Sequence, residues 1–359
     1  MTLAATAAAL AVVSAGCGSD PSEAGSTDGS SSRGITRAQA EVEEFAANPP
    51  LEISALPKRP DEAFAININC TLPVCAPGAL QPAMDALGWR FEEMTFDITE
   101  GPAAVQPVLT QAIAAEPDVI VLPGALPLEG FQSEVDAAAE QGIKFINLGG
   151  DELPPNYVAC IQCKPASVVL GSLAANIVLA DAGGSTDIAV ALDKTVASQL
   201  NEANGVEQEV ERNGEGSEVL EIEQSINATP ADNAARVVSF LQRNPNVEYL
   251  VLASPQFNPA TALNSAGLGS RVKIVGIYPV SEADVAAVED GQVLAWAAME
   301  LTSMYWRIAD AAARVVSGVE LDSAEPVGNM RVINESNADV SLLDPPNYQE
   351  IYKAAWQVD

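Results

Sequence analysis

The sequence predicts an α/β protein built from two doubly wound parallel-sheet lobes. Short apolar segments alternate with helix-length segments from residue 61 to residue 317, which is typical of βαβ units and parallel sheets. Val119–Leu122 and Tyr249–Leu252 are almost purely aliphatic, which indicates strands that are covered on both faces. About ten strands are expected, and this number suits two sheets better than one.

Each expected element follows from local spacing and chain breakers. The first half predicts strands at 63–69, 90–96, 119–122 and 143–148, and helices at 79–87, 103–115 and 131–141. Gly88 and Gly142 follow two of these helices, at natural C-cap positions. The second half predicts strands at 187–192, 218–224, 247–252, 272–277 and 292–298, and helices at 168–180, 196–212, 231–243, 259–266, 282–289 and 301–317.

The N-terminus has the pattern of an export signal. An apolar run, 3–13, is followed by the small residues Ser14-Ala15-Gly16 and then by Cys17, which resembles a bacterial lipobox. We therefore expect residues 1–17 to be a lipoprotein signal peptide with Cys17 acylated; the alternative is a soluble secreted protein with an unrelated cysteine. The run is shorter than the roughly 20 residues of a membrane span, and no later stretch is expected to qualify. Residues 18–60 are expected to be a flexible tether and a proline-rich link.

Charge and composition exclude several classes of function. The formal net charge of −32 repels phosphate backbones, so we expect no nucleic-acid partner, and any membrane contact must come from the lipid anchor. The chain contains no histidine, which removes the Ser-His-Asp triad and most zinc enzymes from consideration.

Four cysteines besides Cys17 need an explanation: Cys70, Cys75, Cys160 and Cys163. In an exported protein they favour two disulfides, and each closely spaced pair can bridge locally. Three connectivities remain open, and a four-thiolate zinc site is the rival interpretation.

The order of these segments resembles the type I periplasmic-binding-protein family. The likeness rests on Gly88-Trp89, on Val105 to Gly124, on Gln141 to Asp151, on Val275-Gly276-Ile277 and on Glu289 to Val293. It implies two lobes joined by a three-strand hinge, with a ligand in the cleft between them. On this order, lobe one takes 61–164 plus 300–330, and lobe two takes 165–299 plus 331–359.

The resemblance places ligand-binding candidates in loops just past strand ends. In lobe one these are Asn69, Thr71, Asp151 and Glu300, and in lobe two they are Gln199, Asn201, Ser254, Gln256, Phe257, Tyr278, Trp296 and Met299. Aromatic and thioether groups stand where sugar binders carry carboxylates and amides, which favours a ligand less polar than a sugar. The alternative is that Trp296 and Met299 are ordinary core residues.

The resulting hypothesis is a solute-binding lipoprotein of an ABC importer, anchored outside the cytoplasm. It would bind a small sugar-like or less polar organic molecule, partner with the permease subunits, act as a monomer and use neither cofactor nor catalysis. A sensory protein that signals to a receptor is the first alternative. A hydrolase on an α/β scaffold is the second, although the chain has no P-loop, no G-x-G-x-x-G after the first strand and no G-x-S-x-G elbow.

Overall fold

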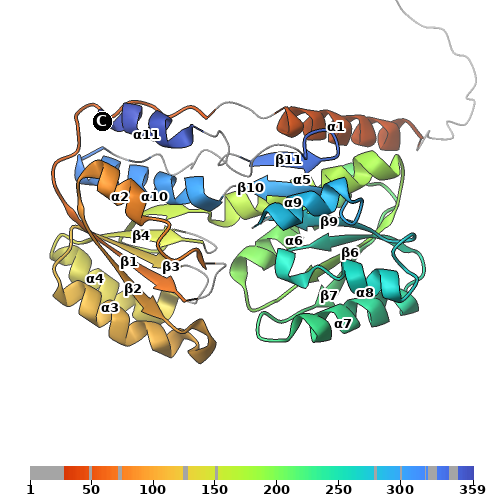
Figure 1. Ribbon diagram of the computed structural model, residues 1–359, viewed down its shortest axis with the longest axis horizontal. Coiled ribbons are helices and arrows are strands. Elements are labelled where there is room, and N and C mark those ends of the chain that lie inside the picture. Colours follow the sequence, from red (N-terminus) through yellow and green to blue (C-terminus); the bar gives the residue numbers. More distant parts are fainter. Residues whose placement is uncertain are drawn as a thin grey trace, which may run out of the picture.

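The computed structural model confirms two lobes, each built on a parallel sheet (Figure 1). It describes residues 28–47, 51–71, 75–123, 128–149, 153–278, 281–299, 301–319, 321, 330–338 and 347–359. Within this part of the chain, one sheet has five strands in the order β2-β1-β3-β4-β5 and the other has six in the order β11-β10-β9-β8-β6-β7. All neighbouring strands are parallel except β11, which is antiparallel to β10.

Lobe one is the five-stranded sheet with helices on both faces. Its strands are β1 (Phe64–Cys70), β2 (Arg90–Phe96), β3 (Val119–Pro123), β4 (Lys144–Leu148) and β5 (Tyr157–Ile161). One face packs on α3 (Val105–Ala114) and α4 (Gln132–Glu140), and the other on α2 (Gln81–Leu87) and α10 (Leu301–Val316). The central strands β1 and β3 are buried on both faces, which explains their largely apolar sequences. The edge strand β2 is only partly buried.

Lobe two repeats this plan with six strands. These are β6 (Asp187–Leu192), β7 (Val219–Glu223), β8 (Val247–Leu252), β9 (Lys273–Ile277), β10 (Ala295–Met299) and β11 (Met330–Asn334). One face packs on α5 (Lys164–Ala182) and α6 (Ala197–Asn213), and the other on α7 (Pro230–Arg243), α8 (Ala260–Ser265) and α9 (Glu282–Glu289). Side-chain caps begin two of these helices: the Thr229 hydroxyl accepts a hydrogen bond from the Asp232 N–H, and Ser281 and Asp284 form a capping box.

The N-terminal helix α1 (Asp28–Ala46) is a correction to the expected tether and link over 18–60. It packs on α5, α6 and β11 of lobe two (Figure 1). Glu41 accepts a hydrogen bond of 2.6 Å from the Asn176 side chain, and Ala38 is fully buried. The buried face and this hydrogen bond hold the segment as a helix on the lobe.

The C-terminal helix α11 (Tyr348–Trp356) also differs from the expectation, which assigned 331–359 to lobe two. β11 does lie in the lobe-two sheet, but α11 packs on α10 and α2 of lobe one. Trp356 is fully buried, stacks on Trp306 with ring centroids 5.4 Å apart, and donates a hydrogen bond of 2.8 Å to Asp310. Burial of the Trp356 indole against α10 therefore fixes the C-terminal helix on lobe one.

Among the described helices, α5 is long and apolar enough to cross a membrane by length and composition, contrary to the expectation for the later chain. It is instead largely buried between α1, α6 and the lobe-two sheet. Its apolar composition therefore reflects a core position.

The backbones of α5 and α6 approach each other closely at two glycines. A Cβ added at Gly171 would lie 1.9 Å from the carbonyl oxygen of Glu202, and one added at Gly205 would lie 2.1 Å from that of Val168. Such contacts are far shorter than van der Waals separations, so neither position accepts a side chain unless the helices separate.

We expect Gly171→Ala to lower the free energy of unfolding by about 2 to 3 kcal/mol, because the added methyl group forces α5 away from α6. Gly184→Ala is the matched control, since a Cβ at Gly184 meets no atom within 4 Å; it should leave stability unchanged or raise it slightly. Urea unfolding of both variants measures the difference. Equal stabilities of the two variants would contradict the packing.

Candidate functional site

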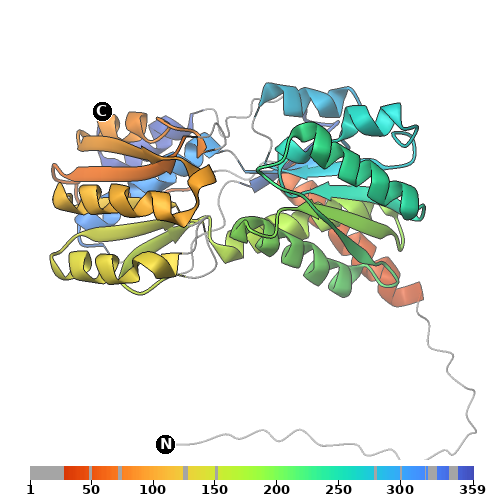
Figure 2. The ribbon, with the colours of Figure 1, turned by 90° about the horizontal axis from the view of Figure 1, so that it is seen from below.

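The chain passes between the lobes at the carboxyl ends of strands. β5 of lobe one leads through Gln162 and Cys163 into α5 of lobe two, and β10 of lobe two leads into α10 of lobe one. Parallel strands end at a common edge, so the carboxyl edges of both sheets border these passages (Figure 2). Ligands of open parallel sheets bind at this edge.

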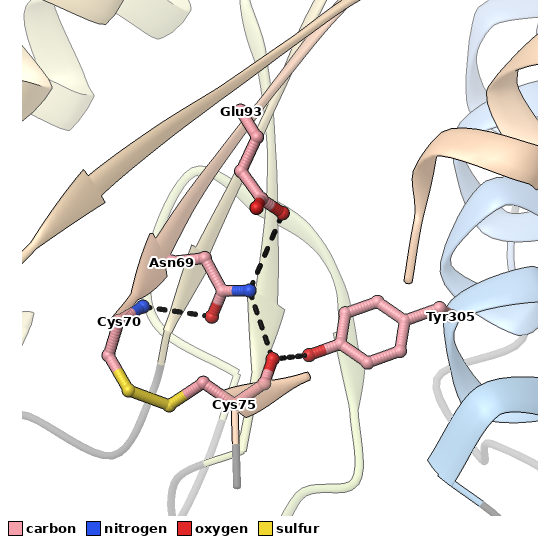
Figure 3. Close-up of a disulfide and its surroundings, with 5 residues drawn as sticks. All are labelled: Asn69, Cys70, Cys75, Glu93 and Tyr305. Atoms are coloured by element: carbon pink, nitrogen blue, oxygen red, sulfur yellow. Dashed lines mark hydrogen bonds between the residues drawn. A yellow bond between two sulfur atoms is a disulfide. The ribbon is translucent and has the colours of Figure 1, made fainter. Parts of the chain in front are cut away.

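At the lobe-one edge, a disulfide and a hydrogen-bond network join Cys75 to Asn69 and Cys70 at the end of β1 (Figure 3). The Asn69 amide nitrogen donates 3.0 Å to the Cys75 carbonyl oxygen and lies 3.5 Å from Glu93, and the Asn69 side-chain oxygen accepts from the Cys70 N–H at 2.9 Å. The Tyr305 hydroxyl donates to the same Cys75 carbonyl. Asn69 therefore positions the loop, and its polar atoms are already engaged within the protein.

Tyr305 links this loop to α10, the helix that receives the second interlobe passage. Burial raises the pKa of Tyr305 to about 12, so the hydroxyl stays protonated and remains a donor at neutral pH. Glu93 also accepts hydrogen bonds from Asn67 at 3.1 Å and from the Gly78 N–H at 2.9 Å. One hydrogen-bond network thus joins Cys75, Glu93 of β2 and Tyr305 of α10.

The remaining lobe-one candidates are less constrained. Thr71 is exposed beside the disulfide loop. Asp151 and Glu300 lie outside the described residues, as does Cys17. The four other cysteines form two disulfides, as expected, and the structure selects the local pairing among the three that were open. Cys70–Cys75 and Cys160–Cys163 each have Cα atoms 5.8 Å apart, an ordinary disulfide separation.

At the lobe-two edge, Asp193 organises the loop after β6. Its carboxylate accepts from the Thr195 N–H at 2.9 Å, the Thr195 hydroxyl at 2.6 Å and the Ile226 N–H at 2.8 Å. Burial opposes ionisation, but these hydrogen bonds outweigh it and hold the pKa of Asp193 below its usual value. Gln199, a sequence candidate, accepts from the Asp193 N–H at 2.7 Å, and Asn201 is buried nearby on α6.

Phe257 and Trp296 are packed in the interior of lobe two, which corrects the expectation that they line the ligand site. Phe257 is 1% exposed and Trp296 is fully buried, both between the sheet and α7–α9. The Trp296 indole N–H donates 2.8 Å to the Asp284 carbonyl, and its ring fills the space over Gly276, where a Cβ would lie 2.0 Å from a ring carbon. Among the neighbouring candidates, Ser254 is buried and Gln256 is exposed.

Met299 and Tyr278 face the opposite side of the lobe-two sheet and are also buried. Tyr278 has a left-handed backbone (φ 59°) directly after β9, and its hydroxyl faces Gln162, Ser167 and Glu202. The Tyr278 and Ser167 hydroxyls and both Glu202 carboxyl oxygens are buried without a hydrogen bond of good geometry. Burial raises the pKa of Glu202 well above its ordinary value, which favours a neutral acid.

Sequence reasoning missed Glu202, Ser167, Glu93 and Tyr305. The signal for the first two was a pair of glycines, Gly171 and Gly205, inside predicted helices, because a glycine there marks a close backbone approach. No pattern in the sequence distinguishes Glu93 and Tyr305, whose contacts join distant segments.

A cavity of about 950 Å³ lies at the other end of the lobe-two sheet. It is bordered by the amino ends of β9 and β10 and by the turn after β11, including Lys273, Leu294 and Glu335. It is therefore separate from the edge that borders the interlobe passages.

We expect stability to depend on pH through Glu202. Because its folded pKa is raised, its contribution is fully present below the ordinary value of 4.5 and is lost as the pH rises toward the folded pKa. Glu202→Gln cannot ionise, so its advantage over the wild type in free energy of unfolding should grow as pH rises from 4.5. Urea unfolding between pH 4.5 and 8 measures this.

Glu209→Gln is the control on the same helix. The buried Glu209 carboxylate accepts a hydrogen bond of 2.6 Å from Arg212 and another from Asn213, so its replacement should lower stability. Parallel pH profiles for the wild type and Glu202→Gln would contradict a neutral buried acid.

The comparisons with known proteins agree with this architecture. A search of curated proteins found no match. Among solved structures, a glucose-galactose binding protein from Geobacillus stearothermophilus is 18% identical, with 78% of this chain and 100% of that chain covered and a TM-score of 0.67. An ABC transporter solute-binding protein from Agrobacterium vitis bound with alpha-D-tagatopyranose is 20% identical, with 80% and 98% covered and a TM-score of 0.65.

A third structure, an ABC transporter periplasmic solute-binding protein from Actinobacillus succinogenes with bound D-allose, is 14% identical, with 77% and 98% covered and a TM-score of 0.64. These three likenesses show a shared fold. The family model described as a periplasmic binding protein domain matches residues 78–320, more than half of the chain. The chain therefore belongs to the periplasmic binding protein family.

Proposed function

We propose that this protein is the solute-binding component of an ABC importer and binds a small molecule between its lobes without transforming it. The observation that carries the proposal is the position of the interlobe passages, which leave both sheets at their carboxyl edges. A ligand held there contacts both lobes only when they approach, so binding favours a closed form that a permease can recognise.

The ligand is a small hydroxyl-rich molecule of the monosaccharide class. The polar side chains at the two edges include Thr71, Gln199, Ser254 and Gln256, and their hydroxyl and amide groups suit hydrogen bonds to ligand hydroxyls. The expectation of a less polar ligand rested on Phe257, Tyr278, Trp296 and Met299, and all four are buried in the hydrophobic clusters of lobe two. The solved relatives bound with tagatose and allose support the same class.

The protein is exported, and acylation of Cys17 anchors it to the outer face of the cell membrane. Support comes from the signal-like sequence that precedes Cys17. Because α1 packs on lobe two, the segment that follows Cys17 leads first to lobe two. Lobe one is therefore connected to the anchor only through residues that follow α1. The functional unit is a monomer partnered by the permease subunits.

We expect one monosaccharide in a panel of glucose, galactose, allose, tagatose and arabinose to raise the melting temperature of the purified protein. At one hundred times the dissociation constant, binding stabilises the native state by about 2.7 kcal/mol, which shifts the transition by several degrees. Apolar ring compounds serve as the comparison. Stabilisation by these compounds and by none of the sugars would contradict the assignment.

Gln256→Ala should weaken binding of that sugar, measured by isothermal titration calorimetry, because Gln256 is an exposed amide just past β8. Gln242→Ala, an exposed glutamine on α7, is the matched control and should keep the wild-type affinity. Equal affinities of the two variants would remove Gln256 from the site.

A further inference from the structure

The first interlobe passage is crossed by a disulfide. Cys160 lies on β5 in the lobe-one sheet, and Cys163 is the N-cap residue of α5 in lobe two. Only Ile161 and Gln162 separate the bonded cysteines, and Gln162 has a left-handed backbone with φ 57°. The covalent ring therefore encloses the residues whose backbone torsions connect the two lobes at this point.

On the lobe-one side, the passage is fixed to β4. The Gly149 N–H donates 2.7 Å to the Ile161 carbonyl, and the Asn147 amide donates 3.4 Å to the Cys160 sulfur. The Cys163 sulfur lies 3.5 Å from the Gly149 carbonyl oxygen. These contacts leave the lobe-one end little freedom to rotate.

On the lobe-two side, the passage continues without a linker into α5. The Ala166 N–H donates 2.9 Å to the Cys163 carbonyl, which closes the first helical turn. α5 is in backbone contact with α6 at Gly171 and Gly205, so α5 cannot turn independently of its lobe. The direction in which α5 leaves Cys163 therefore determines how lobe two is oriented relative to β5 of lobe one.

We propose that the Cys160–Cys163 disulfide limits rotation of the lobes at the first passage and so restricts how far the ligand-free protein opens. Hinges work through large torsional changes in a few connecting residues, and here two of those residues lie inside a closed ring. A narrower open ensemble loses less conformational entropy when a ligand closes the lobes, so the disulfide also strengthens ligand affinity. The affinity part rests on the proposed function, whereas the restriction of opening does not.

The chain provides its own control. Cys70–Cys75 joins two residues of lobe one, at the end of β1 and in the loop after it. Its removal eliminates a disulfide of the same Cα separation, 5.8 Å, and leaves the first interlobe passage unchanged. Cys75→Ser also keeps the backbone carbonyl that accepts the hydrogen bond from Tyr305. General loss of stability then affects both variants, and only a change in lobe motion separates them.

The experiment compares Cys160→Ser/Cys163→Ser with Cys70→Ser/Cys75→Ser, both in the full-length chain carrying Cys17→Ser to keep it free of lipid. Small-angle scattering without ligand should show a larger radius of gyration and a broader distance distribution for the first variant alone. Hydrogen exchange should increase at the first turn of α5 in that variant. Equal scattering profiles for the two variants would overturn the proposal.

If Cys160→Ser/Cys163→Ser does not fold, the Cys70→Ser/Cys75→Ser variant can be treated with dithiothreitol once folded. Two electrons pass to the remaining disulfide, which yields two thiols and oxidised cyclic dithiothreitol, and the same broadening is expected. An unchanged profile after verified reduction would overturn the proposal.

Titration with the stabilising monosaccharide tests the affinity arm. We expect the dissociation constant to rise roughly tenfold when only Cys160–Cys163 is absent, as for one or two residues regaining backbone freedom. Should no sugar bind the wild type, the proposed function fails while the scattering result still decides the hinge restriction. A broader distance distribution with an unchanged dissociation constant would contradict the proposed effect on affinity.

Discussion

Parallel pairing of the strands is the constraint on which the rest of the structure depends. In each lobe it places the carboxyl ends of strands at one edge, and it requires both faces of the sheet to be covered by helices. The chain then leaves lobe one from the end of β5 and leaves lobe two from the end of β10. Loops, passages and polar side chains consequently gather at the edges that border the junction.

The regular part of this fold was readable from the sequence because each element carries its own signal. Val119–Pro123 is an aliphatic strand, and α2 ends at Gly88, whose φ of 72° suits glycine. β5 and β11 were not predicted. Each has five residues and lies at the edge of its sheet.

The terminal helices were misplaced for a different reason. α1 and α11 are held by contacts with residues far away in the sequence, such as Glu41 with Asn176 and Leu56 with Ala355. A local pattern gives the helical period of such a segment but not the lobe that it covers. Residues 18–33 are mainly serine, glycine and aspartate, which favoured an interpretation as a tether, although α1 begins at Asp28.

At the candidate site too, the sequence indicates where a residue lies along a strand but not which distant segments it contacts. Sequence order placed Trp296 near a strand end, but it could not show which face of the strand the indole occupies. The structure alternates Trp296 and Ala298 toward one core and Ala297 and Met299 toward the other. Gly276 on the neighbouring strand provides the space for the indole, so two distant segments together decide that this residue is structural.

The high negative charge of the protein bears on how the Cys160–Cys163 disulfide affects the separation of the lobes. A protein with a net charge of −32 has like charges that repel one another wherever its parts approach, over roughly 8 to 10 Å at ordinary ionic strength. Such repulsion favours separated lobes and opposes closure. The Cys160–Cys163 disulfide restricts this separation without adding charge.

Glu202 also bears on the charge near this passage, because it lies beside Tyr278 on the lobe-two side. Burial raises the pKa of Glu202 and so favours its neutral form, which adds no negative charge at this point.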